Sequence, residues 1–208
     1  MKQFSELMSG QSLLPIIQAN TPGEGVNIAR AMANAGLQLV EVVLRTDSSL
    51  DALSAIKQEV PELTVGAGTI INARILDDAL KAGADFIVTP ASSPGLLGAV
   101  GRSGVPVLPG VSNTADILLA LEYGFPEQKL FPASLSGGAA FLSAVSSVFR
   151  GVSFCPTGGV NADNKEDYLK LSNVFAVGGT WVAKPEWIKN GNWEAVTNAC
   201  SQALSQSV

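Results

Sequence analysis

Eight short runs of β-forming residues recur along this chain of 208 residues, and their recurrence constrains the fold more than any other feature. The runs are spaced by roughly 20 to 25 residues, and the stretches between them have helical periodicity. This alternation is typical of repeated βα units around a parallel sheet. We expect strands at residues 14–18, 39–44, 64–67, 86–89, 107–108, 128–131, 153–155 and 174–177, with a short helix before the first.

Start signals for helices lie between the runs. The signals are capping residues, glycines or prolines at Thr21-Pro22, Asn72, Asn113, Gly138 and Asp163. The connections are short, and no low-complexity linker divides the chain. We therefore predict one α/β domain over residues 1–208, folded as a (β/α)₈ TIM barrel with a short N-terminal helix. The alternative is an open doubly wound sheet, whose glycine fingerprint after the first strand is missing.

Composition excludes several classes of function. The net charge is -5 and no basic cluster is present, which argues against nucleic acid or an anionic membrane as a partner. The absence of histidine removes imidazole acid–base chemistry and the usual zinc site, so we expect no metal. Cys155 and Cys200 are interpreted as reduced, packed thiols. Residues 1–10 do not form a secretory signal and no apolar run spans a membrane, so we expect a cytoplasmic protein.

Lys129 is the central candidate for catalysis. It shares one face of its strand with Phe131, while Gln128 and Leu130 take the other face and Pro132 ends the strand. The amine is therefore expected to point into the barrel. Removal from water favours the neutral amine, which is the form that attacks a ketone to give a Schiff base. The alternative is an edge lysine whose amine extends to solvent.

A carboxylate and a guanidinium share one face of the second strand. Leu39, Glu41, Val43 and Arg45 alternate with apolar residues expected to pack on helices. Glu41 should project into the barrel and Arg45 should lie at its carboxyl-terminal mouth, where barrel active sites are found. The alternative is a Glu41–Arg45 ion pair. Because four strand residues span about 13 Å, such a pair requires Arg45 to fold back.

Glycines follow three of the expected strands. Val65-Gly66-Ala67-Gly68-Thr69 ends the third, and this segment alone is weak evidence because glycine is ordinary at turns. Cys155-Pro156-Thr157-Gly158-Gly159 and Val177-Gly178-Gly179-Thr180 end the seventh and eighth. Loops at these two places commonly bind phosphate through backbone N–H groups, which also suits an acidic protein. The alternative is a pair of tight turns.

Taken together, five segments resemble the 2-keto-3-deoxy-6-phosphogluconate (KDPG) / 4-hydroxy-2-oxoglutarate (KHG) aldolase family, almost from end to end. They are residues 41–46, 65–69, 129–133, 155–159 and 178–181, in the family's order and spacing. The resemblance implies a class I aldolase on a small barrel, with no organic cofactor, and a homotrimer. It also implies that Lys129 forms the Schiff base and that Glu41 shuttles protons.

The same resemblance implies the remaining roles. Substrate contacts would come from Arg45, Thr69, Pro90, Phe131 and Thr157, and phosphate contacts from Gly158, Gly159, Gly179 and Thr180. Some positions depart from the usual family pattern and border the expected pocket, namely Gln18, Ser134 and residues 89–93. The preferred substrate therefore stays open.

The resulting hypothesis is a Schiff-base aldolase that cleaves KDPG to pyruvate and glyceraldehyde 3-phosphate. KHG, which would give pyruvate and glyoxylate, is a further candidate substrate. The alternatives are an aldolase for the galactonate-derived substrate (2-keto-3-deoxy-6-phosphogalactonate), a phosphosugar isomerase or epimerase, and a non-catalytic phosphosugar-binding barrel. A metal-dependent aldolase is disfavoured by the lack of histidine.

Overall fold

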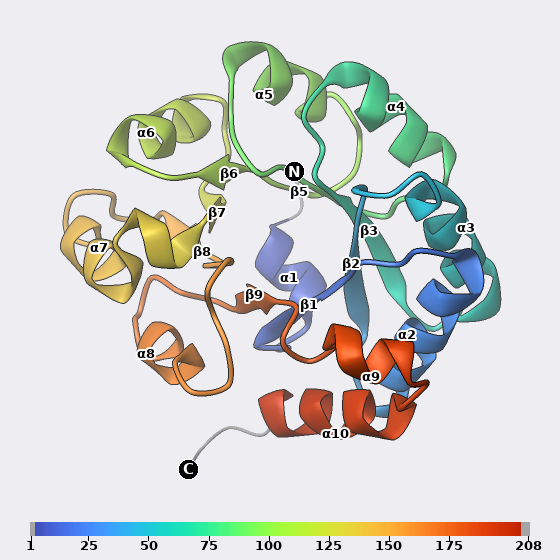
Figure 1. Cartoon of the computed structure of the whole chain (residues 1–208). Coiled ribbons are helices and arrows are strands. Elements are labelled where there is room, and N and C mark those ends of the chain that lie inside the picture. The colour runs from blue at the N-terminus through green and yellow to red at the C-terminus, as the bar shows by residue number, and fades with distance from the viewer. Residues whose placement is uncertain (1–2, 205–208) are drawn as a thin grey trace.

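A ring of parallel strands surrounded by helices forms the molecule in the computed structural model, which describes residues 3–204 (Figure 1). Most strand residues are apolar, and parallel pairing buries both faces. Strand β7 is the exception, since three of its four buried residues are polar or charged. The strands are β1 (Leu13–Ile17), β2 (Leu39–Val43), β3 (Thr64–Gly68), β4 (Ile87–Val88), β5 (Val107–Leu108), β6 (Gly110–Val111), β7 (Glu127–Leu130), β8 (Ser153–Phe154) and β9 (Val177–Gly179).

Two parallel sheets complete the ring. Six strands follow the order β5-β4-β3-β2-β1-β9, and three follow the order β6-β7-β8. Pro109 separates β5 from β6, since proline has no N–H to donate to a ladder. Isolated bridges from Phe154 of β8 to Val174, and from Thr157 to Gly178 of β9, join the two chain segments that contain these strands. The predicted α/β barrel is confirmed.

Two details of the strand prediction were wrong. The last strand was placed at residues 174–177, but β9 comprises Val177–Gly179 and includes both glycines. The fifth strand was expected at residues 107–108, and β5 lies there, but β6 (Gly110–Val111), which follows Pro109, was not predicted.

Helices alternate with the strands, and four of the five start signals read in the sequence mark the beginning of a helix. The Thr21 hydroxyl accepts from Glu24 N at 3.1 Å, and Asn72 accepts from Ile75 N at 2.9 Å. Asp163 was placed too early, since α8 begins at Lys165. The helices are α1 (Phe4–Met8), α2 (Pro22–Asn34), α3 (Ser49–Glu59), α4 (Ala73–Lys81), α5 (Pro94–Val100), α6 (Thr114–Glu122), α7 (Gly138–Val145), α8 (Lys165–Leu169), α9 (Pro185–Lys189) and α10 (Trp193–Leu204), with a 3₁₀ turn at Ala133–Ser136.

The apolar core has two layers. The larger layer lies between strands and helices and includes Val40 and Val42 of β2. The smaller layer fills the barrel, where Leu39 and Phe86 meet Phe4 of α1. Figure 1 shows α1 inside the ring. Because α1 packs at the end where the strands begin, the opposite end is left for a site.

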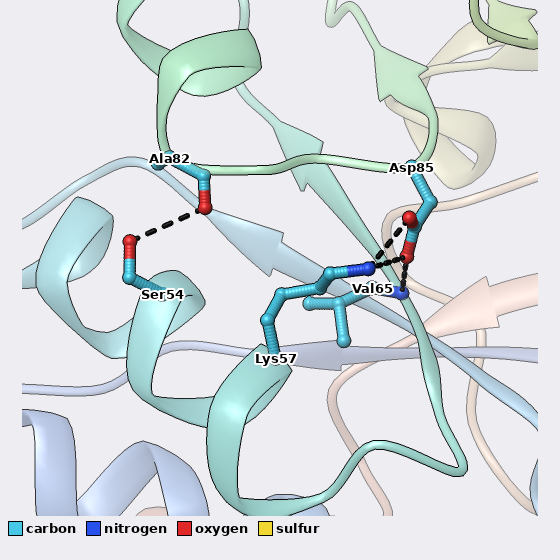
Figure 2. Close-up of polar contacts among 5 residues, drawn as sticks. All are labelled: Ser54, Lys57, Val65, Ala82 and Asp85. Carbon is cyan, nitrogen blue, oxygen red and sulfur yellow. Dashed lines mark hydrogen bonds and ion pairs between the residues drawn. The ribbon is translucent and has the colours of Figure 1, made fainter.

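Polar contacts tie α3 to the strands on either side of α4 (Figure 2). Lys57 Nζ lies 2.6 Å from Asp85 Oδ1, and the other Asp85 oxygen accepts from Val65 N at 2.8 Å. The Ser54 hydroxyl donates to the Ala82 carbonyl at 3.2 Å. Asp85 therefore links α3 to the start of β3 and holds this side of the ring together.

Candidate active site

A cavity of about 150 Å³ opens where the strands end. Strands β1, β7 and β9 contribute to its wall, together with the loops after β2, β7, β8 and β9. Eight residues singled out in the sequence line it: Arg45, Lys129, Phe131, Thr157, Gly158, Gly159, Gly179 and Thr180. The end of the barrel predicted from strand direction therefore carries the cavity.

Lys129 and Glu41 meet at the bottom of this cavity. Nζ of Lys129 lies 3.3 Å from Oε1 of Glu41, with the two side chains 5% and 0% exposed. The Phe131 ring centroid is 5.4 Å from Nζ, so an aromatic face also adjoins the amine. The edge-lysine alternative is excluded because the amine is buried, and the ion-pair partner of Glu41 is Lys129 rather than Arg45.

The Glu41 carboxylate has room because its neighbour on β3 is a glycine. A Cβ at Gly68 would lie 2.0 Å from Oε1 of Glu41, well inside contact distance. The other oxygen, Oε2, is buried and has no hydrogen-bond partner among residues 3–204. A buried carboxylate oxygen without a partner is costly, so Oε2 is available to a water molecule or to a hydroxyl of a bound ligand.

Arg45 and Thr69 form a second polar pair at the mouth. Nε of Arg45 donates to the Thr69 hydroxyl at 3.1 Å. Thr69 has φ of 66°, which is unusual for a β-branched residue. Strained backbone of this kind costs about 1–3 kcal/mol and is often found at functional sites. The pair lies beside the cavity, and Arg45 lines it.

The loops after β8 and β9 provide bare backbone. Gly158 and Gly159 have φ of 93° and 79°, so consecutive residues adopt the left-handed region. A turn of this kind can direct successive N–H groups toward an anion. The Thr157 hydroxyl is accommodated by Gly178 on β9, where a Cβ would lie 2.2 Å from Oγ1.

Cys155 lies beneath this wall and is fully buried. The pKa of its thiol is raised to about 12, mainly because burial disfavours the charged thiolate. The nearby charge of Lys129 lowers this pKa, but its effect is smaller than that of burial. The thiol therefore stays protonated and unreactive at neutral pH. Its place in the inner core makes it part of the apolar base of the site.

Pro90 is not among the residues that line the cavity. Its carbonyl group adjoins Gly110 of β6, which is the register partner of Lys129. A contact between Pro90 and substrate stays a prediction. Two lining residues, Ile16 and Val160, were missed from the sequence. Ile16 could have been found, since it shares the inward face of β1 with Leu14, but no signal marked Val160.

A buried lysine paired with a carboxylate, next to glycine loops at the carboxyl end of a parallel barrel, defines a barrel enzyme equipped for Schiff-base chemistry. The family model for KDPG and KHG aldolases matches residues 4–199. The chain belongs to this family and is a class I aldolase, a carbon–carbon lyase.

Relatives match nearly the whole chain. The KHG/KDPG aldolase of Escherichia coli is 36% identical over 192 residues, which is 92% of this chain and 90% of the relative. The 2-dehydro-3-deoxy-phosphogluconate aldolase of Pseudomonas aeruginosa is 41% identical over 194 residues, covering 93% and 88%.

A solved structure gives the same fold. The KDPG aldolase of Legionella pneumophila, with pyruvate captured as a covalent carbinolamine intermediate, superposes with a TM-score of 0.94 at 36% identity. The match covers 98% of this chain and 99% of that one. In the part of this chain that the structure describes, no helix is long and apolar enough to cross a membrane.

Proposed function

We propose that the chain cleaves KDPG to pyruvate and glyceraldehyde 3-phosphate through an imine on Lys129, and that it also cleaves KHG to pyruvate and glyoxylate. The observation that carries this proposal is the buried pair of Lys129 Nζ and Glu41 Oε1, 3.3 Å apart. The names of the relatives support the substrates, since they are called KHG/KDPG and 2-dehydro-3-deoxy-phosphogluconate aldolases.

The pair supplies a nucleophile and a base. Lys129 attacks the C2 ketone, and loss of water from the carbinolamine gives a protonated imine. As the C3–C4 bond breaks, its electrons move into this imine to form an enamine, and Glu41 accepts the proton of the C4 hydroxyl. The aldehyde leaves, Glu41 returns the proton to C3 of the enamine, and water hydrolyses the imine to release pyruvate and the free amine.

Oε2 of Glu41 suits this role because it is buried without a protein partner in the described chain. The proton therefore passes to this oxygen directly or through one water molecule. Phe131 packs beside Nζ and excludes bulk water from the imine.

The remaining lining residues would hold the two ends of the substrate. Arg45, Thr69 and Thr157 would bind the carboxylate and hydroxyls of the keto acid, with Pro90 at the border of the site. Gly158, Gly159, Gly179 and Thr180 would bind the phosphate, supported by the positive φ angles of the first two. We further propose one catalytic domain over residues 1–208, a homotrimer and a cytoplasmic location.

Borohydride reduction in the presence of pyruvate tests the imine. We expect a reduced pyruvate adduct on the peptide that carries Lys129, and none in Lys129→Ala. Lys81→Ala is the matched control, since Lys81 is exposed on α4. An adduct on a surface lysine, or full cleavage of KDPG by Lys129→Ala, would overturn the imine on Lys129. No adduct and no release of pyruvate would instead favour a phosphosugar isomerase or epimerase on the same barrel.

Cleavage rates on three substrates test the specificity. We expect KDPG to be cleaved faster than KHG and faster than the galactonate-derived epimer, because the glycine loops hold the phosphate and fix the C4 hydroxyl near Glu41. A higher rate on the epimer would reassign the substrate while leaving the imine mechanism intact. Binding of KDPG without release of pyruvate would show a non-catalytic barrel.

A further inference from the structure

Three successive carbonyl groups of the loop after β8 accept hydrogen bonds from groups outside that loop or further along it. The first two donors are backbone groups: Ala133 N donates to the Thr157 carbonyl at 2.7 Å, and Ser134 N donates to the Gly158 carbonyl at 3.0 Å. Both donors belong to the 3₁₀ turn that follows β7. Neither is among the residues that line the active-site cavity. The third carbonyl, that of Gly159, is held by a side chain instead.

This side chain is Asn164, and its amide holds two neighbouring peptide groups. Nδ2 donates to the Gly159 carbonyl at 2.9 Å, and Oδ1 accepts from Asn161 N at 2.8 Å. Oδ1 of Asn161 in turn accepts from Asn164 N at 3.2 Å, which fixes the segment that carries Asn164. Because both ends of the Asn164 amide are bonded to backbone, a substitution at this position releases the Gly159 carbonyl.

The N–H groups of the same three peptide units have no partner within residues 3–204. They belong to Gly158, Gly159 and Val160. In a planar trans peptide the C=O and the following N–H point in opposite directions, so the bonds to the carbonyls direct these N–H groups away from the carbonyl partners. All three residues line the active-site cavity. Successive N–H groups of this kind form a concave site for an anion.

We propose that Asn164 is a positioning residue for the phosphate of KDPG. Its bond to the Gly159 carbonyl turns the N–H of Val160 toward the phosphate oxygens, as a third donor beside the N–H groups of Gly158 and Gly159. This proposal rests on the function proposed above, because it concerns how the same site holds its substrate. Asn164 acts through the loop, since its amide is bonded to the backbone of residues 159 and 161.

Loss of this bond should weaken binding and spare the chemistry. Without the Asn164 amide, the peptide group between Gly159 and Val160 is free to turn, because glycine adopts many backbone conformations. The phosphate takes no part in bond breaking, so a donor to it contributes equally to the bound substrate and to the transition state. A mutation that removes such an interaction raises KM and leaves kcat unchanged.

Steady-state cleavage of KDPG by Asn164→Ala tests this role. Because a hydrogen bond to a charged group is lost, we expect KM to rise by about tenfold or more, with kcat within about threefold of the native value. Incorporation of solvent deuterium into the methyl group of pyruvate needs the imine but no phosphate, so its rate should stay within about twofold of native.

A second variant and a control accompany it. Asn164→Asp keeps an acceptor for Asn161 N but sets a carboxylate oxygen against the Gly159 carbonyl, so KM should rise at least as much. Asn113→Ala is the matched control, because Oδ1 of Asn113 likewise accepts from backbone, at 2.9 Å from Ala115 N. Asn113 lies just before α6, in a turn that carries no residue of the cavity lining, and KM should stay native.

The outcomes separate positioning of the phosphate from general support of the fold. A higher KM for KDPG in both Asn164 variants, with native pyruvate exchange, supports the proposal. A native KM in Asn164→Ala, an equal rise in Asn113→Ala, or a joint loss of KDPG cleavage and pyruvate exchange overturns it. If the native enzyme traps no imine with pyruvate and does not cleave KDPG, the proposed function fails instead, and the two failures are thereby distinguished.

Discussion

Gly68 controls where the Glu41 carboxylate can lie, although it carries no side chain. A Cβ at this position would lie 2.0 Å from Oε1 and 2.9 Å from Cγ of Glu41. Gly178 does the same for Thr157, with a distance of 2.2 Å to Oγ1. Two inward-facing positions of the barrel are therefore left empty so that polar side chains from neighbouring strands can occupy the space.

Gly68→Ala should move the carboxylate while leaving the lysine in place. Because a shift of about 1 Å can cost about 10²-fold in rate, we expect kcat for KDPG cleavage to fall by about that factor. Solvent deuterium should enter the methyl group of pyruvate more slowly by a similar factor. The borohydride-trapped adduct on Lys129 should persist.

Two further variants serve as comparisons for Gly68→Ala. Gly98→Ala on α5 is the control, since the nearest atom to its new Cβ is 3.5 Å away, and it should keep native activity. Glu41→Gln should reproduce the pattern of Gly68→Ala, because it removes the base without touching the backbone. Native turnover in Gly68→Ala would show that the carboxylate does not need its present position.

The two buried thiols should make the free energy of unfolding fall as the pH becomes alkaline. Burial raises the pKa of Cys155 and of Cys200 from 9.0 to about 12. Between pH 9 and pH 12 the thiols ionise in the unfolded chain but stay protonated in the folded one. Their contribution to stability is therefore complete below pH 9 and is lost as the pH rises toward 12.

We therefore expect the free energy of unfolding in urea to be about 3 kcal/mol smaller at pH 10 than at pH 8 through the two thiols. Burial also raises the pKa of Tyr168, which lowers stability over the same pH range. The thiols are therefore tested by comparing the loss of stability in the native chain with the loss in a variant that lacks them. The double variant Cys155→Ala and Cys200→Ala should lose less stability between the two pH values than the native chain. An equal loss would mean that the thiols ionise in the folded state as well.

Alternation along the strands was enough to predict the acid and the amine. Lys129 and Glu41 were assigned to inward faces from the positions of their neighbours alone, and the structure brings them to 3.3 Å. The supporting positions could not be found in this way. Gly68 and Gly178 matter only because a polar side chain from the neighbouring strand segment occupies the space beside them. Thr157 is the direct register partner of Gly178, whereas Glu41 pairs with Gly66 and reaches Gly68 diagonally, so both contacts depend on register.

Among the secondary-structure elements, α1 has a large role for its length. Phe4 is buried in the inner core and meets Phe86 edge to face at 5.2 Å. The backbone N of Ser5 donates to Oε2 of Glu127 at 3.0 Å, which ties the first turn of α1 to the start of β7. The five residues of α1 therefore close the barrel at the end opposite the site.

Phe4→Ala should lower the free energy of unfolding by about 3–5 kcal/mol, because it leaves a cavity in the inner core beside Phe86 and Phe175. Urea unfolding followed by fluorescence or circular dichroism measures this change. Glu6→Ala, on the exposed side of α1, should shift stability by less than about 0.5 kcal/mol. Since α1 lies away from the active site, kcat of folded Phe4→Ala should match the native value, and a large loss of kcat would contradict the assignment of α1 to the closed end.

The boundaries of elements were less predictable than their order. The apolar run at residues 174–177 was read as a strand, but pairing with β1 uses Gly178 and Gly179, which strand propensity disfavours. Register with Leu14 and Pro15 decides the boundary, and that register is a tertiary contact. Pro109 was a local signal for the division of β5 from β6 and could have been used.

At the scale of the whole molecule, α6 presents apolar side chains to solvent. Leu118 and Leu121 are 50% and 38% exposed, and Tyr123 just after the helix is 40% exposed. Residues three apart lie on one face of a helix, so the two leucines form one surface. Exposed apolar groups of this kind are common where protein chains meet. This surface is a candidate contact for the proposed homotrimer.

The mass in solution tests both the trimer and the contact. We expect light scattering to give about three times the chain mass of 21.5 kDa. Leu118→Glu combined with Leu121→Glu should lower this mass, because a carboxylate buried at an interface without a partner is costly. The matched control is Val148→Glu, at a separate position that is 70% exposed. A trimer that persists in the α6 variant would place the contact on another face, whereas the mass of one chain for the native protein would overturn the trimer itself.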